Sequence, residues 1–200
     1  MIDMKQQTLI PGLTVTEAMY ETAAAGLATY APELPALTWE TFTDPAGWAL
    51  VPHEETGLPY KAELTVREHP AGTLRRVNVW YGPDRRGGAR PQPHSHPWPF
   101  EARILTGGYA EDRYALADDQ VNATLGVIHA SGATNDIPRD LYHEVVDVEP
   151  GTLTLMVATA RGVRGGWGYL CVDSGTVTPA LAPTPGFLAA LRDLNPHRPA

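Results

Sequence analysis

The first sixty residues contain one segment in which apolar residues recur at the spacing of a helix. The repeat runs near a period of 3.6 residues until Pro32 ends it. Before it, the four residues from Thr14 to Glu17 have the sequence of a capping box, in which Thr14 would accept a backbone hydrogen bond. We therefore predict one amphipathic helix that begins at Thr14 and packs on a sheet. Its apolar positions are Val15, Met19, Ala23, Leu27 and Tyr30.

From residue 60 onward the chain changes to short runs of apolar and polar residues that are separated by glycine and proline. This organisation is typical of an all-β barrel or sandwich. We predict eight strands, at residues 62–68, 74–81, 102–105, 109–115, 124–129, 143–148, 152–159 and 168–172.

A second helix is predicted near the end of the chain. Thr184 and Pro185 are typical of a helix start, and Asn195 with Pro196 closes the pattern. The whole chain then divides into an N-terminal cover at residues 1–59, a β-barrel at 60–175 and a C-terminal tail at 176–200. The apolar stripe of the second helix consists of Phe187, Ala190, Leu191 and Leu194.

Composition limits the classes of protein. A chain of 200 residues with 43% hydrophobic content can bury one substantial core. The net charge of −8 argues against a nucleic-acid surface, and no apolar run has the length of a membrane span. The N-terminus lacks the apolar region of a signal peptide, and Cys171 is the single cysteine. We therefore expect a cytoplasmic protein that binds neither nucleic acid nor membrane.

The spacing of histidines is the clearest chemical signal in the sequence. His94 and His96 lie two residues apart, and alternate residues of a strand face the same side. Two prolines then break the strand, so that Glu101 can approach the same point from a returning strand. His143 comes from a distant segment, as expected for a sheet that closes around its site. We predict that these four residues bind one metal ion.

Three imidazoles and one carboxylate are ligands that suit a divalent transition metal. We expect Fe(II) first, with Mn, Ni, Zn or Cu as alternatives. Four protein ligands would leave room on an octahedral ion for water, oxygen or substrate. The opposing interpretations are a surface loop for His94 and His96, and an ordinary salt bridge for Glu101.

Residues 88–108 and 132–147 resemble the two conserved boxes of the cupin superfamily. Asp140 and Asp147 stand where that family usually has glycine and asparagine, and aspartate tolerates the turn at the first of these positions. The resemblance implies a double-stranded β-helix, that is, a jelly-roll barrel, with the two predicted helices added to it. It also implies a homodimer, by analogy with related folds. The matching positions are Gly88, His94, His96, Glu101 and Gly108 in the first box, and Gly132, Pro138 and His143 in the second.

Substrate contacts are sought on the face that carries the ligands. Alternation from Glu101 predicts that Arg103 and Leu105 share its face. The guanidinium of Arg103 then needs a partner, which is a substrate carboxylate or phosphate, or one of Glu101 and Asp112.

Aromatic residues near the ligands either form a wall for an organic substrate or belong to the core. These residues are Trp98 and Phe100, with Trp80 or Tyr109 on neighbouring strands. We take Arg103 and Tyr109 as candidate catalytic residues, and Arg103, Trp98 and Trp80 as candidate substrate-binding residues.

Three classes of function fit these residues. The first is a mononuclear metal-dependent enzyme that acts on a small organic metabolite, anionic ones included, with Fe(II) and molecular oxygen as a dioxygenase or other oxidoreductase. The second is a lyase, isomerase or dehydratase that uses the same ion as a Lewis acid. The third is a non-catalytic module that binds a metal or a small molecule.

Overall fold

A computed structural model describes residues 5–68, 74–87, 90–117, 120–158, 167–180 and 183–198. The fold is built mainly from antiparallel strands, and the all-β prediction is confirmed. Gly88 of the first box lies outside the described residues. No helix in the described ranges has both the length and the apolar character that crossing a bilayer requires.

The larger sheet has six strands in the order β3, β4, β5, β11, β6 and β9. The smaller sheet has the order β10, β7 and β8. The bounds are β3 Trp48–Pro52, β4 Pro59–Glu68, β5 Leu74–Trp80, β6 Phe100–Thr106, β7 Gly108–Ala117, β8 Gln120–Ala130, β9 Thr134–Ile137, β10 Tyr142–Val148 and β11 Leu153–Ala158.

A short strand pair extends the smaller sheet. Strands β12 (Gly168–Leu170) and β13 (Val177–Pro179) pair with each other. His94 forms isolated bridges to Tyr169 on one side and to His143 on the other, so the segment around His94 lies between β12 and β10. The sheet pairing itself therefore places His94 beside His143.

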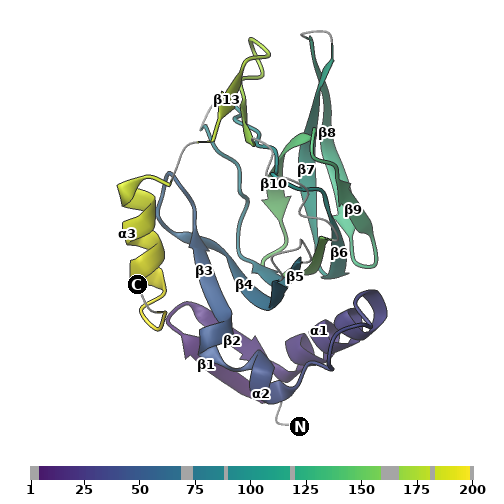
Figure 1. Ribbon diagram of the computed structural model, residues 1–200, viewed down its shortest axis with the longest axis vertical. Coiled ribbons are helices and arrows are strands. Elements are labelled where there is room, and N and C mark those ends of the chain that lie inside the picture. Colours follow the sequence, from purple (N-terminus) through teal and green to yellow (C-terminus); the bar gives the residue numbers. More distant parts are fainter. Residues whose placement is uncertain are drawn as a thin grey trace.

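The N-terminal segment covers the outer face of the six-stranded sheet (Figure 1). Strands β1 (Gln6–Ile10) and β2 (Leu13–Thr16) form a hairpin, followed by α1 (Glu17–Tyr30), α2 (Trp39–Phe42) and a short 3-10 turn at Pro45–Gly47. The largest apolar cluster of the molecule lies between this cover and the sheet, and it includes Leu27, Trp48, Leu64, Val79 and Leu155. The outer faces of β4, β5 and β11 are therefore largely apolar, with Arg75 of β5 paired with Glu33 of the cover, and the polar side chains of these strands that line the cavity face inward.

Helix α3 (Pro185–Leu194) packs beside β3, the edge strand of the larger sheet. Its C-cap residue, Asn195, is buried, accepts a hydrogen bond from the amide of Leu50 at 2.7 Å and donates one to the carbonyl of Leu50 at 2.8 Å. Thr184 caps its start as predicted, through a hydrogen bond from the amide of Phe187.

The eight predicted strands are all present, and five further strands were not predicted: β1, β2, β3, β9 and β13. The capping residue of helix α1 lies two positions later than expected: Thr14 is in strand β2, and Thr16 accepts the capping bond from the amide of Met19 at 3.2 Å. Strand β3 pairs with β4, so the sheet begins before residue 60, within the segment expected to be only a cover.

Steric constraints explain why two positions of the boxes are occupied by glycine. Gly132 has a φ of +85°, which side chains rarely adopt. A Cβ at Gly108 would lie 2.9 Å from the carbonyl oxygen of His129 on the paired strand. Gly132 lies in the turn between β8 and β9, and Gly108 begins β7, where it lies close to the backbone of the paired strand β8.

Candidate metal centre

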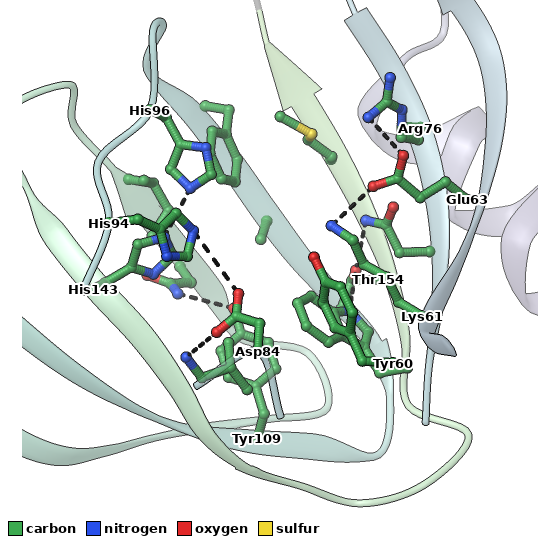
Figure 2. Close-up of a pocket in the computed structure, with 18 of the residues that line it drawn as sticks. Tyr60, Lys61, Glu63, Arg76, Asp84, His94, His96, Tyr109, His143 and Thr154 are labelled. Carbon is green, nitrogen blue, oxygen red and sulfur yellow. Dashed lines mark hydrogen bonds and ion pairs between the residues drawn. The ribbon is translucent and has the colours of Figure 1, made fainter. Parts of the chain in front are cut away.

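Three histidine side chains meet between the two sheets (Figure 2). The ligand atoms of His94, His96 and His143 all lie within 4.8 Å of one another. His94 and His143 are paired by two backbone hydrogen bonds of 3.1 and 2.9 Å, and His96 follows two residues later. The Nε2 atoms of His96 and His143 are 2.8 Å apart. The structure therefore brings together the three histidines that the sequence placed in one site.

The first two histidines are held in the neutral form. Burial, followed by the neighbouring imidazoles, lowers the pKa of His94 well below its usual value. The same causes, burial and then His143, lower the pKa of His96. A neutral imidazole offers a lone pair to a metal, whereas a protonated one does not.

A buried carboxylate fixes the orientation of His143. Glu111 on β7 is fully buried and accepts a hydrogen bond from Nδ1 of His143 at 2.6 Å. It also accepts bonds from Nε2 of His129 at 2.8 Å and from the amide of Asn135 at 2.6 Å. With its proton on Nδ1, His143 presents the lone pair of Nε2 to the cluster.

The pKa of Glu111 matches this arrangement. Burial alone would raise it, but the hydrogen bonds from His129 and His143 outweigh burial and lower the pKa to about 2. Glu111 was not predicted from the sequence. The only available signal was its position two residues after Tyr109, on the same face of the predicted strand.

A second carboxylate, Asp84, approaches the cluster from the loop after β5. One of its oxygens accepts a hydrogen bond from the amide of Val145 at 2.7 Å, and the other lies 3.9 Å from Nε2 of His94. Asp84 is buried, and Figure 2 shows it beside His94 and His143. Asp84 was not identified from the sequence either.

The structure does not bring Glu101 to the histidines. Strand β6 begins at Phe100, whose ring packs against that of His96 with 4.8 Å between centroids. Phe100 and Ala102 line the cavity, so Glu101 and Arg103 face the opposite side of the sheet, toward the N-terminal cover. There the carboxylate of Glu101 pairs with Arg103.

Arg103 also lies outside the cavity. Its guanidinium donates to Thr134 and Glu101 and stacks over the ring of Tyr30 in α1, 4.9 Å from the centroid. The partner of Arg103 in the structure is Glu101. A substrate anion in the cavity is not its partner, because Arg103 does not line the cavity. Leu105 shares this outer face, as alternation predicted, and contacts α1 near Gly26.

The aromatic candidates do line the cavity. Trp80, Trp98, Phe100 and Tyr109 all contribute to its walls. Trp80 and Tyr109 pack against each other with 5.9 Å between centroids, and the hydroxyl of Tyr109 accepts a hydrogen bond from Asn135 at 2.9 Å. Burial raises the pKa of Tyr109 above its usual value, so its hydroxyl keeps its proton at neutral pH.

The cavity has a volume of about 460 Å³, which is sufficient for a small organic molecule. The histidines lie on one wall, and Lys61, Glu63 and Arg76 lie on the facing wall (Figure 2). Arg86 also borders the cavity, where it pairs with Glu54 at 3.0 Å and donates to the hydroxyl of Tyr169.

The histidine cluster fits a transition-metal ion. Nδ1 of His94 is buried and has no hydrogen-bond partner among the described residues. The close approach of two Nε2 atoms places two imidazole nitrogens where a cation can accept both lone pairs. Three imidazole ligands would suit Fe, Zn, Cu or Ni, and the cluster borders the cavity, so a molecule bound there would lie next to such an ion.

No protein-family model and no curated protein matches this sequence. Several solved structures are similar to part of it. KdgF from Halomonas sp. is 17% identical, over 52% of this chain and 84% of its own, with a TM-score of 0.34. Fe(II)-HppE with the alternative substrate (S)-1-HPP is 10% identical over 57% of both chains, with a TM-score of 0.39.

A third similar structure is the oxalate decarboxylase of Lactobacillus farciminis in a formate complex, which is 17% identical over 52% of this chain and 28% of its own, with a TM-score of 0.35. This chain therefore spans little more than half of HppE and about a quarter of the decarboxylase. In this chain two antiparallel sheets face each other around three converging histidines, which is the arrangement that the resemblance of its sequence to the cupin boxes implies.

Proposed function

We propose that this protein is a mononuclear metal-dependent enzyme that oxidises a small organic molecule with molecular oxygen, using Fe(II). One observation carries the proposal: the imidazoles of two buried histidines and one partly buried histidine converge on one point that borders a cavity of about 460 Å³. His94, His96 and His143 would hold the ion. When bound, the ion supplies a site at which substrate and oxygen can be brought together.

The residues around the ligands have positioning roles in this proposal. Glu111 keeps the proton of His143 on Nδ1 and thereby keeps Nε2 available. Asp84 orients the neighbouring strand through the amide of Val145. The rings of Trp80, Trp98 and Phe100 line the cavity, where they exclude water and pack against the organic part of a substrate.

The test is metal analysis followed by oxygen consumption. Protein purified without a metal-affinity tag is analysed for Fe, Mn, Ni, Cu and Zn, and then reconstituted anaerobically with each ion. We expect one equivalent of iron and oxygen uptake in the presence of an accepted metabolite, but not with the zinc form. One equivalent of zinc with no oxygen uptake in any reconstituted form would reject the proposed oxygen-dependent enzyme.

The second candidate is a lyase, isomerase or dehydratase that uses the ion as a Lewis acid. The observation in its favour is the presence of Tyr60 and Lys61 in the cavity, since both can donate a proton to a substrate atom. Burial raises the pKa of Tyr60, so its phenol keeps the proton that such a step requires. Turnover of the same metabolite without oxygen, supported by zinc, would favour this reaction.

We also propose that the protein is a homodimer in the cytoplasm. The exposed edge strand β8, with Leu125 and Ile128 at its surface, is a suitable place for a second copy to pair. Light scattering on the purified chain tests the dimer, and a monomeric mass at high concentration would contradict it.

A further inference from the structure

The wall that faces the histidines contains an unusual group of charges. Lys61 and Glu63 lie two residues apart on β4, and Arg76 lies on the neighbouring strand β5. The carboxylate of Glu63 is 2.8 Å from Nζ of Lys61 and 2.8 Å from the guanidinium of Arg76. One carboxylate therefore serves two cations, and all three side chains are mostly buried.

The remaining charges that line the cavity are already partnered. Arg86 pairs with Glu54. Asp84 accepts the amide of Val145 and lies beside His94. Lys61, Glu63 and Arg76 together carry one net positive charge on this wall, whereas the carboxylate of Asp84 lies beside the histidines on the opposite wall. We call these three residues the cation triad.

The cation triad remains charged at neutral pH. Burial alone would lower the pKa of Lys61, but the carboxylate of Glu63 outweighs burial and raises it. For Glu63 burial acts in the other direction, and the two cations outweigh it and lower the pKa. The net positive charge of this wall is therefore kept at neutral pH.

Unsatisfied polar atoms lie beside the triad. Nε of Arg76 is a buried donor and Oδ1 of Asn78 is a buried acceptor, and in the part of the chain that the structure describes neither has a hydrogen-bond partner. The two residues alternate on β5, and both side chains line the cavity. Buried polar atoms without partners are costly, so a bound molecule that satisfies them would be favoured.

Strand register explains why these groups lie together. Glu63 pairs with Asn78 across β4 and β5, and Lys61 pairs with Trp80. Nζ of Lys61 lies 5.2 Å from the centre of the Trp80 ring and 5.3 Å from that of Tyr60, so it is held over aromatic faces with donors to spare.

From these observations we infer that Lys61 and Arg76 bind the anionic group of the molecule that enters the cavity, and that this molecule is a small monocarboxylate with a hydroxyl or amino group. One excess positive charge matches a single carboxylate, and the free acceptor of Asn78 matches a hydroxyl or amine donor. The inference deepens the proposed function, because it names the substrate class for the same cavity.

The experiment measures binding of L-lactate and L-mandelate, with lactamide and mandelamide as neutral counterparts, by NMR titration. It is done on the full chain both without metal and with one equivalent of Zn. We expect the acids to bind at least about tenfold more tightly than the amides in both forms. Lys61→Met and Arg76→Met should remove this preference while metal content stays unchanged. Glu63→Gln should strengthen binding of the acids, because it frees both cations.

Glu63→Gln keeps the inference testable if Lys61→Met or Arg76→Met impairs folding. If the triad had only a structural role, Glu63→Gln would not strengthen binding of the acids. Arg103→Leu is the matched control: it removes a cation from the outer face of the same sheet, and binding of the acids should be unchanged. Equal binding of acids and amides would overturn the inference. So would tighter binding of methylphosphonate than of the acids, which would indicate a dianion.

Two outcomes separate this inference from the proposed function. If binding of the acids requires the metal and is unchanged in Lys61→Met, the carboxylate binds to the ion. This result would overturn the inference but not the assignment of the metal centre. Acid binding that depends on Lys61 in a protein that takes up no metal would support the inference and reject the metal-dependent enzyme.

Discussion

The two walls of the cavity differ in how they hold their charge. The histidine wall holds imidazoles, with the carboxylate of Glu111 behind them and that of Asp84 beside them. The facing wall carries the charged cation triad in the cavity itself. A site for a cation and a site for an anion therefore face each other across one cavity. The comparison suggests that the first wall selects an ion and the second selects a substrate, and variants on each wall should separate these tasks.

The largest effect is expected on the histidine wall. His96→Ala and His143→Ala each remove one of three ligands, so we expect loss of stoichiometric metal while the fold persists. Metal content after dialysis and far-ultraviolet circular dichroism measure the two. Lys61→Met is the control from the facing wall and should keep its metal. Full metal occupancy in either histidine variant would refute the ligand assignment.

The next effect concerns the residue behind the ligands. Glu111→Gln removes the ionised acceptor that holds His143, and we expect the affinity for the metal to fall about 10- to 100-fold. Competition with a chromophoric chelator measures this. Glu144→Gln is a matched control, because Glu144 is equally buried but accepts the amides of Arg86 and Gln92 instead. Equal losses in both variants would show a general effect of removing a buried carboxylate.

A pH dependence follows from the lowered pKa values of His94 and His96. In the unfolded chain these groups take up protons below about pH 6.5, whereas in the folded protein they stay neutral. Their contribution to stability is therefore complete above pH 6.5 and is lost as the pH falls. The free energy of unfolding of the metal-free protein should decrease by about 1.4 kcal/mol per pH unit for each group.

Urea denaturation at pH 7.5, 6.5 and 5.5 tests this dependence. A His96→Gln variant should show a shallower slope. The pKa of Glu111, at about 2, affects stability only below its unfolded value of 4.5, so it does not interfere in this window. An identical slope in wild type and variant would assign the pH dependence to other groups.

The smallest effect belongs to Arg103, which lies on neither wall. Arg103→Leu removes a partly exposed pair with Glu101 and a contact with the Tyr30 ring, so we expect a loss of about 1 kcal/mol or less in the free energy of unfolding. Thermal and urea denaturation measure this, together with unchanged metal content. A loss of metal in Arg103→Leu would return this residue to the site.

The sequence was sufficient to predict the three histidines, but not the carboxylates beside them or the charges of the facing wall. His94, His96 and His143 stand in two recognisable spacings, and the eight predicted strands follow apolar runs. The cation triad has no motif, because its residues meet only through the register of β4 and β5. The short strand β9 has the sequence TNDI, which contains turn-forming residues and so did not indicate a strand.

For Glu101 the rule that strand residues alternate between faces was correct, but the prediction assigned Glu101 to the wrong face of β6. Alternation does place Glu101, Arg103 and Leu105 on one side of β6, but which side depends on where the strand begins after the prolines. It begins at Phe100, whose ring takes the inward position beside His96. The sequence cannot fix that starting point, since the turn before β6 is set by packing against His96 and the sheet.

The hydrogen bonds of Asn195 to Leu50 have a practical consequence for handling the protein. A single amide side chain bonds with both backbone groups of Leu50, as a residue of an adjoining strand would, at the open border of the larger sheet. A truncation that removes Asn195 would expose the backbone groups of Leu50, and we expect the protein to self-associate through them. Purification tags are therefore better attached at the start of the chain than in place of its final helix.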